Sequence, residues 1–204
     1  MKRLLLFAGI LGILLVPRPA AAAMIQGATL VATGGAVTAE FMGHTAGFTN
    51  ELYLFADDLT TLLYPGVIFN NHTTPVGTQV NLGTFAAGTE LVFAIRVLNT
   101  GDLFFMGAGS RNSDGLTHAA VDDGLLPQFP DYGAPIPAGF VGVGFEDIFG
   151  PGFPQGISDR DFDDLGYAFN SVRVVRSAPE PVSLSLFAIG LAGMGARRMR
   201  QRRG

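Results

Sequence analysis

Apolar residues alternate with other residues in several short runs along the chain, and this period of two predicts β-strands. The clearest run covers residues 90–98, where every second residue from Leu91 to Val97 is large and apolar. The opposite face, from Val92 to Leu98, is apolar except at Arg96. A strand that is apolar on both faces is expected to lie inside a sheet and to be buried on both sides.

Further short runs of the same kind are separated by glycine, proline and other turn residues. They are expected to form strands at residues 51–55, 67–69, 78–82, 103–106, 140–145, 165–169 and 172–175. Residues 99–137 are expected to be rich in loops. No part of residues 24–177 shows a helical period or an internal repeat. The sequence therefore predicts an all-β fold, built as one antiparallel β-sandwich or jelly-roll-like domain.

The first 23 residues have the three parts of a secretory signal peptide. Lys2 and Arg3 give it a positive start. The apolar run 4–16 follows, and the alanines at 20–23 offer small residues to a signal peptidase. We therefore expect cleavage before Met24. A stable membrane anchor would need a longer apolar run.

The other end of the chain begins with Pro179, Glu180 and Pro181. An apolar stretch of 15 residues follows at 182–196, and five arginines lie at 197–203. This order resembles the PEP-CTERM sorting signal of Gram-negative bacteria. The resemblance implies that an exosortase removes the tail near the Pro-Glu-Pro motif, after the short apolar helix has held the chain transiently in the inner membrane. A plain tail anchor with its arginines in the cytoplasm is the alternative.

These ends divide the chain into a signal peptide (1–23), a middle domain (24–177) and a sorting tail (178–204). The PEP-CTERM resemblance also implies a location. It places the mature protein at the surface, or in the extracellular matrix, of a Gram-negative bacterium that makes an exopolysaccharide biofilm.

The formal charge of −4 for the whole chain hides an uneven distribution. Eight of the 13 lysines and arginines lie in the two ends, whereas 16 of the 17 acidic residues lie in the middle domain. That domain carries a formal charge of about −11, which opposes binding to nucleic acid and favours divalent cations. An acidic surface that only keeps a secreted protein soluble is the alternative. The chain has no cysteine, which excludes disulfides and cysteine-bound zinc.

Six carboxylates fall within 19 positions near the end of the middle domain. They are Glu146, Asp147, Asp159, Asp161, Asp163 and Asp164. Side chains this crowded repel one another unless a cation neutralises them. Ca²⁺ accepts several carboxylate oxygens and tolerates irregular geometry, so these six residues are the candidate calcium ligands. A solvated acidic loop without metal is the alternative.

The Asp-x-Asp-x-Asp spacing does not make this segment an EF-hand. The sixth position of such a loop is glycine but is Asp164 here, and the twelfth is glutamate but is Asn170 here. The flanking residues are also expected to form strands rather than helices.

The aspartate-rich segment is expected to be extended from Asp159 to Asp163. Its alternate aspartates then share one face, while Arg160 and Phe162 point the other way. Phe162 is expected to anchor the segment in the core. Pairing of Arg160 with a carboxylate is an alternative that reduces the need for a metal ion.

The two acidic segments resemble those of the family called domain of unknown function 4114. The resemblance rests on residues 144–147 and 159–164, and also on 82–91 and 112–118. It covers most of residues 44–175 and implies a β-rich fold whose acidic motifs bind calcium.

The family resemblance adds candidate ligands in the segment 112–118, which matches an Asp/His loop of that family. These further candidates are Asn112, Asp114 and His118. The spacer at 150–158 is longer than in the family, which leaves open whether both acidic segments reach one ion.

The sequence holds no motif for a serine nucleophile, a phosphate-binding loop or a dinucleotide site. We therefore expect no enzyme but a structural or adhesive calcium-binding protein of the exopolysaccharide layer. A calcium-dependent carbohydrate-binding module is the alternative, and a polysaccharide hydrolase ranks behind it. Against sugar binding, the chain has no tryptophan and only four tyrosines to stack on sugar rings.

Overall fold

The computed structural model describes residues 24–122, 135–150 and 158–176. The expected signal peptide and sorting tail, with Pro179, Glu180 and Pro181, lie outside the described residues. Within the described part of the chain, no helical segment has the length and hydropathy that a membrane crossing needs.

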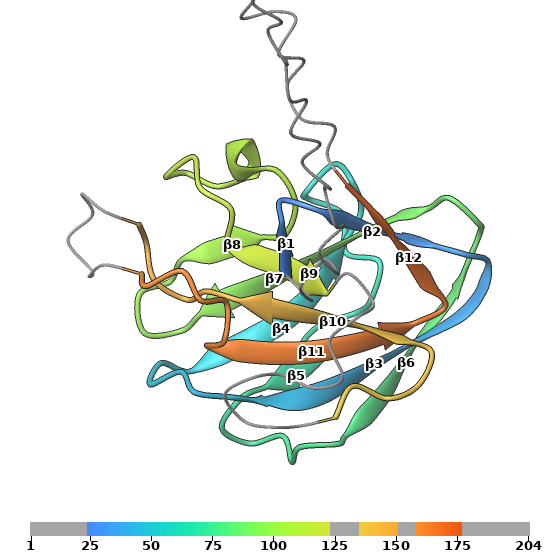
Figure 1. Cartoon of the computed structure of the whole chain (residues 1–204), viewed down its shortest axis with the longest axis horizontal. Helices are drawn as coiled ribbons and strands as arrows, with labels where there is room; N and C mark the ends of the chain where they lie inside the picture. The colour runs from blue at the N-terminus through green and yellow to red at the C-terminus, as the bar shows by residue number, and fades with distance from the viewer. Residues whose placement is uncertain (1–23, 123–134, 151–157, 177–204) are drawn as a thin grey trace, which may run out of the picture.

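The described strands form two antiparallel sheets (Figure 1). In order across the sheet, the first contains β1 (Met24–Gln26), β9 (Ala119–Asp122), β10 (Phe140–Phe145), β11 (Leu165–Asn170), β3 (Gly35–His44) and β6 (Gln79–Phe85). The second contains β12 (Val172–Val175), β2 (Thr29–Ala32), β7 (Glu90–Val97), β4 (Asn50–Phe55) and β5 (Phe69–Asn70), with β8 (Leu103–Phe105) also paired to β7. The helical content of the described residues is one 3₁₀ turn, η1 (Gly109–Arg111). The predicted all-β class is confirmed.

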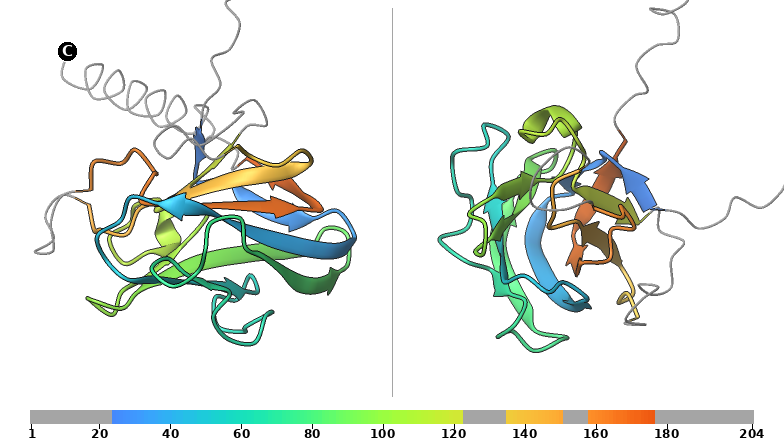
Figure 2. Two further views of the ribbon diagram at one scale, coloured as in Figure 1. Left: turned by 90° about the horizontal axis from the view of Figure 1, so that it is seen from below. Right: turned by 90° about the vertical axis from the view of Figure 1, so that its left-hand side faces the viewer.

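Aromatic rings hold the two sheets together as two layers (Figure 2). Phe93 of β7 stacks on Phe169 of β11 with 3.9 Å between ring centroids. Phe69 of β5 stacks on Tyr167 of β11 with 6.0 Å between centroids. Since each pair joins one sheet to the other, the core lies between the layers.

Strand β7 is the buried central strand that the sequence predicts. It pairs with β4 along one edge, and with β2 and β8 along the other. Leu91 to Ile95 are 0% exposed, while Arg96 is exposed to solvent. The strands at 140–145 and 172–175 also have the predicted bounds.

The sequence did not predict β1, β2, β3 and β9. In β3, alternate residues Val37, Ala39 and Phe41 are buried, but the strand is rich in glycine and alanine, which have low β-propensity. Strand β9 lies inside residues 99–137, which were expected to be rich in loops, and no strand was predicted at its position. Its small buried residues pack between β1 and β10 and so gain strand structure from their neighbours.

Two chain crossings between the sheets lie next to each other. The link from β2 to β3 uses Gly34 and Gly35 at φ of 104° and 102°, a region that favours glycine. The link from β11 to β12 passes through Ser171 at φ of 54°. The Thr33 N–H donates to the Ser171 carbonyl at 2.9 Å, which fastens one crossing to the other.

Truncation of the inter-sheet ring pair tests this account of the core. We expect Phe93→Ala to lower the free energy of unfolding by about 3–5 kcal/mol, because it removes a buried ring and leaves a cavity. Urea denaturation followed by circular dichroism measures the change. Val76→Ala is the control, since Val76 is 63% exposed and its truncation is expected to cost less than about 0.5 kcal/mol. Equal losses in the two variants contradict the account.

Candidate metal centre

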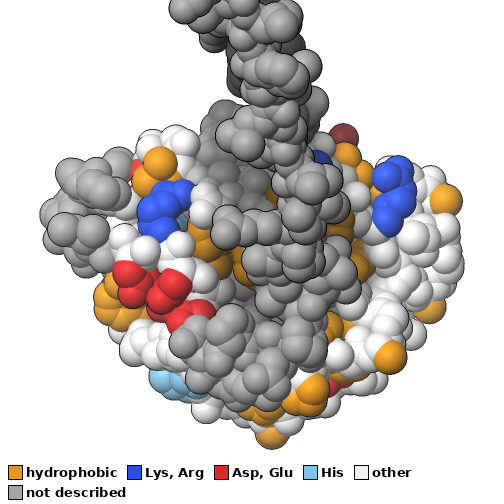
Figure 3. Space-filling model, in the orientation of Figure 1, with side chains coloured by type: hydrophobic (Ala, Val, Ile, Leu, Met, Phe, Trp, Pro, Cys, Tyr) orange, Lys and Arg blue, Asp and Glu red, His pale blue; other side chains and the backbone are white. Residues whose placement is uncertain are grey.

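The two acidic segments meet because β10 and β11 are paired neighbours. Phe145 at the end of β10 lies opposite Leu165 at the start of β11. Glu146 and Asp147 follow the first of these residues, and Asp164 precedes the second. Figure 3 shows acidic side chains gathered in one compact patch at this end of the first sheet.

The segment 158–164 is not the extended strand that the sequence predicted. Arg160 and Phe162 have φ of 62° and 61°, in the left-handed region, so the chain turns sharply twice. The predicted shared face of alternate aspartates is therefore wrong for this segment. Phe162 is nonetheless 4% exposed, which confirms its burial.

A glycine of β10 allows this segment to lie against the sheet. A Cβ atom placed on Gly144 would overlap the carbonyl oxygen of Phe162. Any other residue at this position forces the segment away from the strand. The Gly-Phe-Glu-Asp motif therefore supplies both the close approach and the acidic residues that follow it.

The Glu146 side chain is the centre around which the segment is wrapped. It is only 1% exposed. Its Oε1 accepts a hydrogen bond from the Phe162 N–H at 2.5 Å, and its Oε2 accepts one from the Ser158 hydroxyl. Both donors come from the segment before β11, so Glu146 fixes where that segment runs.

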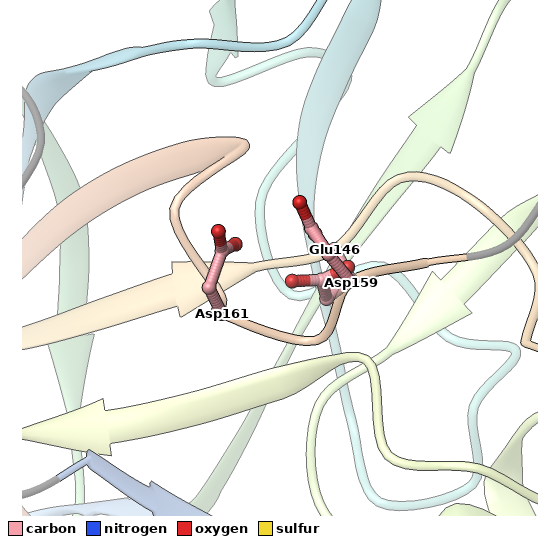
Figure 4. A group of neighbouring side chains, drawn as sticks. All are labelled: Glu146, Asp159 and Asp161. Atoms are coloured by element: carbon pink, nitrogen blue, oxygen red, sulfur yellow. The ribbon is translucent and has the colours of Figure 1, made fainter.

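The wrapped segment brings Asp159 and Asp161 to Glu146, as Figure 4 shows. One carboxylate oxygen from each of the three residues lies within 4.8 Å of the other two. Asp159 and Asp161 are exposed, whereas Glu146 is buried. We call these three residues the outer cluster.

Arg160 does not neutralise the outer cluster. Its guanidinium donates to Gln26 Oε1 and to Thr117 Oγ1, each at 3.3 Å, and lies 5.9 Å from the centre of the Phe162 ring. The alternative in which Arg160 pairs with a carboxylate and replaces the metal ion gains no support from these contacts.

The other three predicted ligands, Asp147, Asp163 and Asp164, form hydrogen bonds outside the outer cluster. Asp147 and Asp164 form what we call the inner pair, in which the Asp147 N–H donates to Asp164 Oδ2 at 2.9 Å. The amide of Asn50 donates to Asp147 Oδ2 at 2.7 Å. Asp163 Oδ1 accepts a hydrogen bond from the Thr45 hydroxyl at 3.2 Å. The six carboxylates thus share one end of the molecule but divide into distinct groups.

Burial shifts the pKa values of the carboxyl groups at this end upward. It raises the pKa of Glu146, and the charges of Asp164 and Asp161 act in the same direction. It likewise raises the pKa of Asp147, to which the Glu146 charge contributes. Burial raises the pKa of Asp164 to about 7, with the charges of Asp147 and Asp159 adding to the effect. Each shift means that the folded chain favours a proton, or another cation, at these oxygens.

The candidate ligands of the segment 112–118 serve a different purpose. His118 is 2% exposed, and its ring nitrogens lie 3.2 Å from the Glu146 carbonyl and 2.9 Å from Asp114 Oδ2. Asn112 bonds the backbone of Phe105 through both its side-chain oxygen and its nitrogen. These side chains are occupied in supporting the fold, so the structure does not bring them into the outer cluster.

Asp114 confirms this supporting role. Burial alone raises the pKa of its carboxyl, but donors from Leu116, His118 and Gly150 outweigh burial and lower the pKa. Hydrogen bonds therefore stabilise the ionised Asp114 carboxylate without a metal ion.

Sequence reasoning missed the partners that hold the carboxylates in place. Ser158 is the last residue of the spacer and carried no signal of its own. Asn50 lies 97 positions before Asp147, and only the pairing of strands brings them together. The resemblance to domain of unknown function 4114 began near residue 44 but did not mark Asn50.

Comparison of the chain with models of known protein families, with curated proteins and with solved structures finds no match. The resemblances to the PEP-CTERM signal and to domain of unknown function 4114 therefore stay predictions.

The raised pKa values predict how stability depends on pH without metal. An acid whose pKa rises on folding contributes stability that is fully present below its unfolded pKa, near 3.8 for aspartate, and lost as the pH rises through its folded pKa, about 7 for Asp164. We expect the melting temperature in EDTA to fall from about pH 5 to about pH 8. Thermal unfolding by circular dichroism measures this.

Asp164→Asn gives the matched comparison for the pH experiment. The amide cannot ionise, so this variant is expected to show a flatter pH dependence, whereas Asp57→Asn on the exposed surface keeps the wild-type slope. A metal-free melting temperature that rises over the same pH interval contradicts the prediction.

Proposed function

We propose that this chain is an exported, non-catalytic calcium-binding protein whose outer cluster holds a Ca²⁺ ion. The observation that supports it is the convergence of Glu146, Asp159 and Asp161, with one oxygen of each within 4.8 Å of the others. Ca²⁺ at 2.3–2.6 Å from each ligand fits between oxygens at about this spacing.

The chemistry of the donors favours calcium over other metals. All three side chains offer hard carboxylate oxygens, and no histidine nitrogen belongs to the group. Zinc prefers nitrogen and sulfur ligands in a regular tetrahedron. The exposed position of Asp159 and Asp161 leaves room for water molecules to complete the coordination shell, as calcium sites usually require.

The sequence and fold support a domain of the cell surface or extracellular matrix. The two antiparallel sheets suit a β-sandwich or jelly-roll-like domain over residues 24–177. The predicted signal peptide and PEP-CTERM tail imply handling by signal peptidase and exosortase. Outside the cell, calcium concentrations are high enough to fill a site of modest affinity. We infer a structural or adhesive role in the exopolysaccharide layer.

The spacing of the carboxylates supports a cation site over hydrolysis of a sugar. Glycosidases keep their acid and their base or nucleophile about 5–9.5 Å apart, on either side of the bond they cut. One oxygen from each residue of the outer cluster lies within 4.8 Å of the other two, and the three residues come from the end of β10 and the segment before β11. Such crowding suits shared coordination of one ion.

Calcium-dependent carbohydrate binding is the second candidate function. A cavity of about 400 Å³ on the second sheet is lined by Tyr53, Phe55, Leu62, Arg96, Gly101 and Leu103. The Tyr53 and Phe55 rings lie 6.4 Å apart and are half-buried. Aromatic rings beside a guanidinium offer stacking and hydrogen bonding together, which are the contacts that sugars use.

Calorimetric titration of the full chain with Ca²⁺ tests the calcium proposal. We expect Asp159→Asn/Asp161→Asn to bind one Ca²⁺ ion fewer per chain than the wild type, because two of three ligand charges are lost. Bound calcium at 100 times its Kd stabilises the folded state by about 2.7 kcal/mol, so the melting temperature gives a second readout.

Asp57→Asn/Asp102→Asn provides the matched control for this titration. It removes the same charge at two residues that do not belong to the outer cluster and is expected to keep the wild-type number of ions. Equal stoichiometry and affinity in the wild type and in Asp159→Asn/Asp161→Asn would reject the outer cluster as the site.

A glycan array separates the two candidate functions. Binding that needs Ca²⁺ and is lost in Tyr53→Ala favours the carbohydrate-binding module. A blank array, with calcium binding intact, favours the structural or adhesive role.

A further inference from the structure

Two histidines that lie far apart in the sequence meet at the surface of the fold. His44 is the last residue of β3, and His72 lies in the turn that follows β5. Their rings meet edge to face, with 5.0 Å between centroids and an angle of 80° between the ring planes. His72 is exposed and His44 is half-buried, so an ion in solution can reach the pair.

The loop between β3 and β4 fixes which nitrogen of each ring carries the hydrogen. His44 Nδ1 lies 3.2 Å from the Ala46 carbonyl oxygen, and His72 Nε2 lies 3.1 Å from the Phe48 carbonyl oxygen. A carbonyl oxygen can only accept a hydrogen bond, so both of these nitrogens must be donors. In the neutral rings the lone pairs therefore lie on His44 Nε2 and His72 Nδ1.

These two lone pairs are available to a ligand. Among residues 24–122, 135–150 and 158–176, neither His44 Nε2 nor His72 Nδ1 has a hydrogen-bond partner. A histidine that binds a metal ion usually donates its other ring N–H to a backbone carbonyl or a carboxylate, which fixes the ring and makes the ligating nitrogen more basic. Both histidines already have this arrangement.

The separation of the rings suits one ion held by both. A metal–nitrogen bond of about 2.0–2.1 Å puts the ring centroid about 3.2 Å from the ion. Two such bonds at about 90–110° separate the centroids by about 4.5–5.2 Å, and the observed separation is 5.0 Å. An ordinary edge-to-face pair of rings can have the same separation, and the two unpaired nitrogens are what favour an ion.

The surroundings of the pair also favour a cation. His44 lies opposite Leu165, the residue that follows Asp164, because β3 pairs with β11. The hydroxyl of Thr45, the next residue after His44, donates to Asp163 Oδ1 at 3.2 Å. Figure 3 shows histidine atoms on the same face of the molecule as the acidic patch. Carboxylates near a site create a negative potential that raises the local concentration of cations.

We propose that His44 Nε2 and His72 Nδ1 bind a divalent transition-metal ion such as Cu²⁺ or Zn²⁺, at what we call the histidine site. Imidazole nitrogen is a preferred ligand of these metals, whereas calcium takes oxygen ligands. Water completes the coordination shell on the exposed side. The site shares no residue with the outer cluster and does not depend on calcium binding.

An ion at the histidine site connects the two sheets. His44 belongs to β3 of the first sheet, and His72 directly follows β5 of the second. The folded chain presents both nitrogens together, whereas the unfolded chain does not. Binding is therefore expected to raise the melting temperature.

Electron paramagnetic resonance with Cu²⁺ tests the proposal, because Cu²⁺ binds most tightly among these metals and its spectrum reports nitrogen ligands. The sample is the full chain without a histidine tag, in a mild detergent and in millimolar CaCl₂ that competes for the carboxylates. We expect one equivalent of Cu²⁺ to show two coordinated imidazole nitrogens. Calorimetric titration gives the affinity.

His72→Gln and His44→Asn separate metal binding from support of the fold. The glutamine amide can donate to the Phe48 carbonyl and the asparagine amide to the Ala46 carbonyl, but neither side chain offers an imidazole lone pair. Each variant is expected to bind Cu²⁺ at least tenfold more weakly and to keep the melting temperature of the metal-free wild type. Thr73→Ala, at an exposed neighbour of His72, is the control and is expected to keep the wild-type affinity.

The nitrogen count and the two variants decide the proposal together. Two imidazole nitrogens in the wild type, with weaker binding in both variants, support the histidine site. Fewer than two imidazole nitrogens, or an unchanged affinity in either variant, overturns it. Asp159→Asn/Asp161→Asn is expected to bind Cu²⁺ at the histidine site as the wild type does, so failure of this inference leaves the calcium proposal to its own test.

Discussion

The buried carboxylate of Glu146 is the feature on which the acidic end of the molecule depends. Burial of a charged group without hydrogen bonds costs several kcal/mol, and here both donors come from the segment before β11. That segment must wrap around Glu146 to bring the Phe162 N–H and the Ser158 hydroxyl to it, and an extended strand cannot do so. The wrapped path needs Gly144, because a side chain there would overlap the Phe162 carbonyl. It also leaves the neighbouring aspartates exposed beside Glu146, which creates the outer cluster.

The same arrangement makes the metal-free state of this end unfavourable. Asp147 is buried and Asp164 is half-buried beside it. In addition to burial, the Asp147 charge raises the pKa of Asp164, and the Asp164 charge raises the pKa of Glu146. A proton relieves the repulsion at acidic pH, and a divalent cation relieves it at neutral pH. Under the proposed function, calcium binding adds to the stability of the β10–β11 end.

Local patterns predicted much of the fold and the place of the site, but not the internal geometry of the site. Strand β7 and the bounds of β10 and β12 follow from alternation, because large apolar residues mark their buried faces. Strands β3 and β9 were not predicted, because their small residues have a weak alternation of apolar side chains. They gain strand structure from the neighbours with which they pair. The sequence left open whether both acidic segments reach one ion, and the pairing of β10 with β11 brings them to the same end of the molecule. Their division into an outer cluster and an inner pair depends on left-handed backbone at Phe162 and on Asn50, far away in sequence, and neither has a local signature.

The central claim, that Glu146 organises a calcium site with Asp159 and Asp161, is tested most directly by a crystal structure determined with calcium. Anomalous scattering identifies the ion, and coordinate distances identify its ligands. The account predicts an anomalous peak with carboxylate oxygens of all three residues at about 2.3–2.6 Å. A well-ordered 158–164 segment without such a peak, in crystals grown with millimolar Ca²⁺, would contradict it.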